Sequence, residues 1–227
     1  MESIRIGEKI LAKNAEMAAR NRERFEACGI CVVMLAGSPG SGKTSLLEQS
    51  VPVLGAHFRV GVIEGDIETD RDGQRIAKLG VPVVQIVTGG TCHLNAAMVN
   101  QVLDRLPLDC LDLLLVENVG NLVCPAAYDL GEHLYVVVGS VTEGEDKPVK
   151  YPAMFRRAHA MVLNKMDLLP HLNFSVQEAI GYAQLANPLL RIFPASCRTG
   201  EGIAAWMEWL IWWSQHKRVV ELEAVEI

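Results

Sequence analysis

Short apolar runs alternate with longer helical patterns along most of this 227-residue chain. Each run is almost continuously apolar, which is typical of a strand buried on both faces. The runs of strand length cover residues 30–36, 58–63, 82–87, 111–116, 133–138, 160–163 and 189–193. The clearest helical patterns between and after them cover residues 43–54, 94–106, 175–186 and 202–213. This alternation predicts an α/β fold, with a mostly parallel sheet and helices on both of its faces.

The two ends of the chain carry patterns of their own. Residues 4–25 have apolar side chains at roughly helical spacing, which predicts an amphipathic N-terminal helix within residues 1–28. Residues 217–227 alternate apolar and acidic side chains toward their end, which is typical of an added strand or a frayed tail. No Pro-, Gly- or Ser-rich linker, repeat or low-complexity tract divides the chain, so we predict a single domain over residues 1–227.

Composition narrows the classes of protein that the chain can represent. Half of the residues are apolar and 21% are charged, which is a globular composition and excludes a disordered chain. The net charge of −6, without a basic block, argues against nucleic acid or an anionic membrane as a partner. No window reaches the roughly 18 apolar residues of a membrane span, and nothing at the N-terminus is typical of an export signal. Six cysteines are too few for a disulfide scaffold, so we expect a reducing, cytoplasmic setting.

A glycine-rich phosphate-binding motif follows the first apolar run and precedes a helical pattern. It reads Gly-Ser-Pro-Gly-Ser-Gly-Lys-Thr and matches GxxxxGK(S/T), the P-loop. In such a loop, backbone N–H groups face a polyphosphate, Lys43 neutralises the β- and γ-phosphate oxygens, and Thr44 offers a hydroxyl to Mg²⁺. The predicted phosphate-binding residues are Gly37, Ser38, Pro39, Gly40, Ser41, Gly42, Lys43, Thr44 and Ser45.

Two acidic residues stand at the ends of predicted strands. Asp66 follows the second run and Glu117 ends the fourth. Ligands of parallel sheets bind beyond the carboxyl ends of the strands, so both acids should lie at the P-loop edge. We expect Asp66 to join the Mg²⁺ shell or orient water, Glu117 to take a Walker-B-like role, and Lys43 to complete the catalytic set. Asp70 and Asp72 are expected early in a helix, where they favour the helix dipole.

A second motif indicates which base the site binds. Asn164, Lys165 and Asp167 form the NKxD pattern of GTP-binding proteins after the sixth run. A carboxylate at Asp167 can accept hydrogen bonds from both N1–H and the 2-amino group of guanine, and adenine offers no such pair of donors. Ser196 and Cys197 follow the last run and resemble the loop that contacts guanine O6. These motifs must meet the P-loop around one nucleotide, so they should belong to one folded unit.

A third group of residues has the chemistry of a transition-metal site. Cys92 and His93 follow the third run, and Cys124 follows the fourth, so the three side chains can converge at one sheet edge. Thiolate and imidazole suit Zn²⁺ or Ni²⁺, and a cysteine at a helix N-terminus has a lowered pKa. Three ligands are one short of a closed zinc site, which implies an open position or a second subunit. The alternative is a cysteine packed as a small hydrophobic residue and a histidine that caps a helix.

Together these motifs resemble the HypB family, the GTPases that incorporate nickel into hydrogenases. The segments that carry the resemblance span residues 38–202: SPGSGKTSLL, VIEGD, TGGTCHLNAAM, ENVGNLVCPA, SVTEGEDKPVKYP, LNKMDLLP and TGEG. ENVGNLVCP and SVTEGEDKP are long enough to be distinctive among P-loop proteins. The Cys-Pro-His arrangement of the related urease nickel GTPases is absent from the sequence.

The resemblance implies a SIMIBI-type P-loop fold and a GTPase that dimerises with GTP. It further implies a nickel-delivery partner protein and the large-subunit precursor of a nickel–iron hydrogenase, to which nickel is handed. By resemblance, Cys92, His93 and Cys124 form the nickel or zinc site at the dimer interface, and Lys147 lies close to the neighbouring subunit's nucleotide.

The chain departs from the family pattern in two respects. Neither an N-terminal cysteine motif nor a histidine-rich run precedes Cys28, so we expect no high-affinity nickel storage. Asn95 stands where the family usually has an acid, and the smaller negative charge is expected to weaken metal binding.

The sequence suggests a mechanism and leaves two alternatives open. We hypothesise that GTP and Mg²⁺, held by Lys43, Thr44, Asp66 and Glu117, order the strand-end loops and so move Cys124. No water-orienting glutamine or arginine finger is evident, so hydrolysis should be slow. One alternative is a P-loop kinase of small molecules, which leaves the NKxD motif unexplained. The other is a metal carrier that ignores its nucleotide.

Overall fold

The computed structural model describes residues 6–225 and the side chains of residues 9–216. Its centre is a seven-stranded sheet in which all neighbouring strands run parallel, which confirms the predicted α/β class. The order is β3-β2-β4-β1-β5-β6-β7, so the strand that leads into the P-loop lies in the middle. The strands are β1 (Cys31–Ala36), β2 (Val60–Asp66), β3 (Val83–Val87), β4 (Leu113–Glu117), β5 (Leu134–Ser140), β6 (Ala160–Asn164) and β7 (Arg191–Pro194).

Every predicted apolar run forms one of these strands. All residues of the central strands β1 and β4 are buried, which explains their unbroken hydrophobicity, because such strands are covered on both faces. The edge strands β3 and β7 are only partly buried. All seven strands lie in one sheet, which is consistent with the predicted single domain; the domain organisation stays a prediction.

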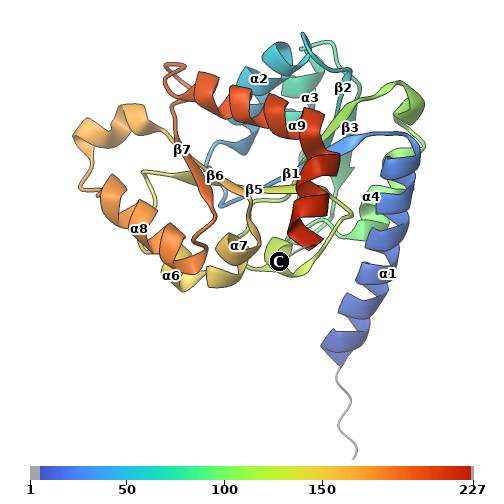
Figure 1. Cartoon of the computed structure of the whole chain (residues 1–227), viewed down its shortest axis with the longest axis horizontal. Helices are drawn as coiled ribbons and strands as arrows, with labels where there is room; N and C mark the ends of the chain where they lie inside the picture. Colours follow the sequence, from blue (N-terminus) through green and yellow to red (C-terminus); the bar gives the residue numbers. More distant parts are fainter. Residues whose placement is uncertain (1–5, 226–227) are drawn as a thin grey trace, which may run out of the picture.

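Helices cover both faces of the sheet, as the alternation predicts (Figure 1). On one face, side chains of α2, α3 and α9 form a core that includes Trp206 and Ile76; on the other, α1, α4, α7 and α8 contribute Phe25, Val99 and Phe155. The helices are α1 (Ile6–Ala27), α2 (Lys43–Leu54), α3 (Arg71–Ala77), α4 (Ala96–Leu103), α7 (Pro152–Arg157), α8 (Val176–Ala186) and α9 (Ile203–Val225).

Short helices in the connections were not predicted as separate elements. They are α5 (Cys124–Ala127), α6 (Lys147–Lys150) and the 3₁₀ helices η1 (Leu108–Cys110) and η2 (Met166–His171). Four residues hold little more than one helical turn, so no periodic pattern can reveal them. α5 and α6 each have a proline at the first or second position, where its fixed φ and missing N–H are tolerated.

The two terminal helices differ in how well the sequence predicts them. α1 forms as expected and reaches away from the body of the molecule at its N-terminal end (Figure 1). α9 continues as helix to Val225, so the expectation of an added strand is wrong, and residues 226–227 lie outside the described part. Residues 217–224 are rich in Lys, Arg, Glu, Leu and Ala, which favour helix. None of the described helices combines the length and the hydropathy that a membrane crossing requires.

Candidate functional site

The P-loop joins β1 to α2 and is fixed against β6 by a buried side chain. Asn164 donates a hydrogen bond from Nδ2 to the Ser41 carbonyl over 3.0 Å. Gly42 has a φ of +98°, and a Cβ at this position would lie 2.2 Å from Asn164 Nδ2. Only glycine meets both conditions, because a side chain disfavours positive φ and there is no room for one. The NKxD motif and the P-loop are therefore in direct contact.

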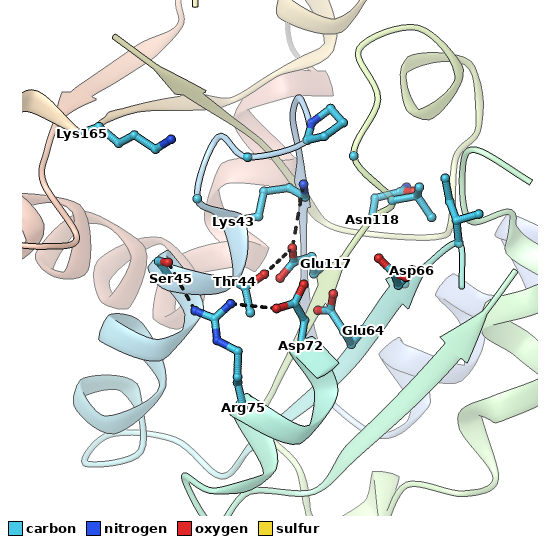
Figure 2. A pocket seen from close by; sticks show the side chains of 17 residues that line it. Lys43, Thr44, Ser45, Glu64, Asp66, Asp72, Arg75, Glu117, Asn118 and Lys165 are labelled. Carbon is cyan, nitrogen blue, oxygen red and sulfur yellow. Dashed lines mark hydrogen bonds and ion pairs between the residues drawn. The ribbon is translucent and has the colours of Figure 1, made fainter. Parts of the chain in front are cut away.

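Lys43 and Thr44 both reach Glu117 at the end of β4 (Figure 2). Thr44 donates a hydrogen bond from Oγ1 to Glu117 Oε1 over 3.0 Å, and Lys43 Nζ lies 3.9 Å from the same oxygen. Lys43 Nζ is also 3.5 Å from the Ser38 carbonyl oxygen. All three side chains are buried, so the predicted catalytic lysine, the Mg²⁺-binding hydroxyl and the Walker-B-like acid form one cluster.

A second buried carboxylate stands beside Glu117. Glu64 of β2 is the register partner of Glu117 of β4. Within the described chain, Oε2 of each is buried without a hydrogen-bond partner. Burial raises the pKa of both groups, and the charge of Glu117 raises the pKa of Glu64 further. Lys43 Nζ is 3.9 Å from Glu117 Oε1, and the two Oε2 atoms that have no hydrogen-bond partner are suited to a divalent cation. In the sequence, Glu64 stands out only as part of its motif, because its pairing with Glu117 depends on strand order.

Asp66 lies at the end of β2 and lines one cavity together with Lys43, Thr44, Glu64 and Glu117. Its Oδ1 accepts hydrogen bonds from the backbone N–H groups of Glu68 and Thr69, at 2.9 and 2.7 Å. Burial raises the pKa of Asp66, but the hydrogen bonds from Thr69 and Glu68 outweigh it and hold the pKa below its usual value. Asp66 is thus a stable carboxylate at the expected edge of the sheet.

These residues surround a cavity of about 470 Å³, which is also lined by two side chains of α3, Asp72 and Arg75. Asp72, expected only to favour a helix dipole, points into this region beside Arg75 (Figure 2). Arg75 is bound by Asp72 at 2.7 Å and by Glu48 at 2.6 Å. No sequence signal indicated Arg75, and its pairing with two carboxylates argues against a role as a free arginine finger.

The NKxD motif and the loop after β7 enclose a second cavity of about 290 Å³. Asn164 Oδ1 accepts a hydrogen bond from the Cys197 N–H over 3.1 Å, and Ser196 Oγ donates to Asp167 Oδ1 over 2.6 Å. Burial raises the pKa of Cys197 to about 11, so this thiol stays neutral. Lys165 lines both cavities and has a φ of +65°. A nucleotide can therefore place its base in this cavity and its phosphates in the larger one.

Cys92, His93 and Cys124 come together as the sequence analysis predicted. Their candidate ligand atoms all lie within 4.8 Å of one another. The two sulfur atoms are 3.2 Å apart, and Cys92 Sγ is 3.9 Å from His93 Nδ1. All three side chains are partly exposed, which leaves access for an ion. The alternative of a cysteine buried as a small hydrophobic residue does not fit this geometry.

The surroundings of this cluster shift the pKa values of His93 and Cys124. The Tyr128 ring lies 4.0 Å from the His93 ring, centroid to centroid. Burial lowers the pKa of His93, which favours the neutral imidazole that metals bind. Cys124 begins α5, yet its hydrogen-bonded contact with Cys92 and its burial raise its pKa. The neighbouring thiol is the main cause of this raised pKa, so Cys124 holds its proton more tightly than an isolated cysteine does.

Lys147 lies beside the P-loop of its own chain. Its Nζ is 3.9 Å from Glu143 Oε2, which accepts a 2.5 Å hydrogen bond from Ser38 Oγ. Glu143 was not singled out by the sequence analysis, although it belongs to one of the distinctive segments. The predicted approach of Lys147 to a neighbouring subunit stays a prediction.

The chain is similar to proteins of one family. The family model described as "CobW/HypB/UreG, nucleotide-binding domain" matches residues 31–194. The hydrogenase maturation factor HypB of Azotobacter vinelandii is 54% identical over 209 residues, which cover 91% of this chain and 68% of that protein. The crystal structure of HypB from Helicobacter pylori in complex with nickel has a TM-score of 0.84 and 38% identity, and the match covers 90% of this chain and 96% of that one.

A more distant likeness concerns the fold alone. The signal recognition particle 54 kDa protein of Aeropyrum pernix K1, in complex with GDP, has a TM-score of 0.55 at 16% identity. That match covers 77% of this chain and 42% of the other. Together with the family match, it confirms the expected SIMIBI-type P-loop fold.

Proposed function

This chain belongs to the HypB family of hydrogenase maturation factors, and from that premise we propose that it binds nickel or zinc and controls this binding through GTP. The chain contains the nucleotide-binding GTPase domain of the family. One observation carries the proposal: the ligand atoms of Cys92, His93 and Cys124 lie within 4.8 Å of one another at the edge of the sheet that holds the P-loop.

We assign guanine to the smaller cavity. Asp167 lines this cavity and accepts a hydrogen bond from Ser196 Oγ, while Asn164 binds both the P-loop and the Cys197 backbone. A carboxylate recognises the two donors of guanine and is left unpaired by adenine. The kinase alternative has no support from this arrangement, because it leaves Asp167 without a role.

We assign the phosphates and Mg²⁺ to the larger cavity. The Thr44 hydroxyl and the carboxylates of Asp66 and Glu117 would hold the ion, and the unpaired oxygens of Glu64 and Glu117 are suited to a nearby divalent charge. The ion would supply neutralisation of the β- and γ-phosphate oxygens. Lys43 adds a positive charge at the same place, so positioning and charge neutralisation would promote hydrolysis. We expect a slow rate, because the described residues that line this cavity include neither a glutamine nor an unpaired arginine.

We infer that the metal at Cys92, His93 and Cys124 is the cargo. Three ligands leave a coordination position open, which suits a site that must release its ion or receive a fourth ligand from a second protomer. We propose a GTP-dependent homodimer that obtains nickel from a delivery partner and transfers it to the precursor of the hydrogenase large subunit. The six free thiols fit a reducing cytoplasm.

Binding assays on matched cysteine variants test this proposal. Purified full-length protein is titrated with Ni²⁺, Zn²⁺, GTP and ATP, and Cys92→Ala and Cys124→Ala are compared with Cys110→Ala, which removes an exposed thiol outside the cluster. We expect GTP to bind far better than ATP and only the first two variants to lose metal affinity. Equal binding of ATP contradicts the GTPase assignment, and unchanged metal affinity in Cys92→Ala contradicts the metal site.

A further inference from the structure

Asn118 is a fully buried polar residue directly after Glu117. Its backbone N–H donates to the Leu35 carbonyl over 2.9 Å, and its Nδ2 donates to Met34 Sδ over 3.3 Å. Both partners belong to β1, the strand that leads into the P-loop. Asn118 is thus fixed to the strand before the P-loop and covalently joined to the acid that contacts Thr44.

The side-chain oxygen of Asn118 contacts the loop that carries Cys92 and His93. Asn118 Oδ1 accepts a hydrogen bond from the backbone N–H of Leu94 over 2.9 Å. Leu94 follows His93 directly and is itself fully buried. Water is therefore excluded as a substitute partner, and separating Leu94 from Asn118 would leave a buried donor and acceptor unpaired.

Leu94 is also packed against β2, the strand that carries Glu64 and Asp66. A Cβ on Gly65 would lie 2.7 Å from Leu94 Cδ1, so the side chain sits directly over this glycine. Gly65 stands between Glu64 and Asp66 at the end of β2. Leu94 is therefore held at the ends of two strands that line the larger cavity. It donates a hydrogen bond to Asn118 after β4 and packs closely against Gly65 of β2.

Cys124 has a separate connection to the P-loop. The backbone N–H of Asn121 donates to the Gly37 carbonyl over 2.9 Å, and the two residues form an isolated β-bridge. Asn121 Oδ1 then accepts from the Val123 N–H over 2.8 Å. This route does not pass through Asn118, so the His93 side of the metal cluster can be tested by itself.

We propose that Asn118 is the positioning residue through which the nucleotide cavity sets the place of His93. A shift at Glu117 when the nucleotide changes must move Leu94 as well or break a buried hydrogen bond. His93 then moves relative to the two thiols, and metal affinity changes with nucleotide state. This inference rests on the proposed function, since it names the residue that carries the link between the two sites.

Variants of Asn118 distinguish a role in coupling the nucleotide and metal sites from a contribution to the stability of the fold alone. Asn118→Leu removes the acceptor for the Leu94 N–H, whereas Asn118→Asp keeps an acceptor there and loses the donor to Met34. Met34→Leu is the matched control, because it removes the sulfur and leaves the bond to Leu94 intact. If Asn118→Leu does not fold, Asn118→Ser replaces it, since its shorter side chain ends before the Leu94 N–H.

The experiment measures Ni²⁺ dissociation constants at saturating GDP and at a saturating non-hydrolysable GTP analogue. For Asn118→Leu, the ratio of the two constants should fall to within about twofold of one, while Met34→Leu and Asn118→Asp retain most of the wild-type ratio. The absorption bands of bound Ni²⁺, compared between the two nucleotides, should cease to differ in the same variant. A wild-type ratio preserved in Asn118→Leu overturns the inference alone. A ratio of one in the wild-type protein overturns the proposed coupling as well.

Discussion

The sulfur atoms of Cys92 and Cys124 lie 3.2 Å apart, although 32 positions separate the two residues in the sequence. The loops that carry them leave β3 and β4, which are not neighbours, because β2 lies between them. The metal cluster therefore spans the end of β2, where Glu64 and Asp66 line the phosphate cavity. Metal and nucleotide sites are adjacent because of strand order.

Replacement of Lys43 by alanine should abolish GTP hydrolysis and leave metal binding in place. Lys43 is buried beside Glu117, so its removal takes away phosphate neutralisation and leaves a buried acid without its cation. We expect turnover to fall by about 100-fold or more, as for other preorganised charges that stabilise a transition state. Phosphate release and Ni²⁺ titration measure the two effects. Lys150→Ala, which alters an exposed lysine paired with Asp146, is the control; turnover retained in Lys43→Ala contradicts the assignment.

Asp167→Asn should change which purine the site accepts. An amide has only one acceptor oxygen for the two guanine donors, whereas its N–H can donate to the 2-oxo group of xanthine. GTP affinity should fall by at least about tenfold, and the affinity for xanthosine triphosphate should rise relative to that for GTP. Competition against a fluorescent guanine nucleotide measures both changes, with Asp104→Asn as an exposed control on another face. Undiminished GTP affinity in Asp167→Asn would mean that the base lies elsewhere.

Asn95→Asp should strengthen metal binding without weakening α4. Asn95 is the N-cap of this helix and accepts a 2.9 Å hydrogen bond from the Met98 N–H, and aspartate caps equally well. The added negative charge stands two residues from His93 and favours a cation nearby. We expect a several-fold lower Ni²⁺ dissociation constant and an unchanged melting temperature. Weaker Ni²⁺ binding in this variant would refute the charge argument.

The buried Glu132 should make stability depend on pH. Burial raises its pKa from 4.5 to about 7, although the ion pair with Arg157 opposes this shift and the charge of Asp129 adds to it. A raised pKa means that the folded state binds the proton more tightly. The stabilisation is complete below pH 4.5 and is lost as pH rises through 7. Glu132→Gln should flatten the unfolding free energy over this window in urea titrations. An identical pH profile in the two proteins contradicts the assignment.

Local sequence signals were sufficient for much of the site. The P-loop and NKxD residues carry their chemistry in short motifs, and the unbroken hydrophobicity of the strands follows from burial on both faces. The contact between Asn118 and Leu94 joins positions 24 apart, and no local pattern encodes it. Arg75 and Glu143 were missed for the same reason, since their partners come from other elements.

The dependence of metal affinity on the bound nucleotide can be measured directly on the wild-type protein. Wild-type protein is titrated with Ni²⁺ and Zn²⁺ in the presence of GDP and of a non-hydrolysable GTP analogue, while its molecular mass in solution is recorded. We predict that the two nucleotides give different metal dissociation constants and that the analogue favours the dimer. Identical dissociation constants and an unchanged mass with both nucleotides would contradict the account and leave a GTPase whose metal cluster ignores its nucleotide.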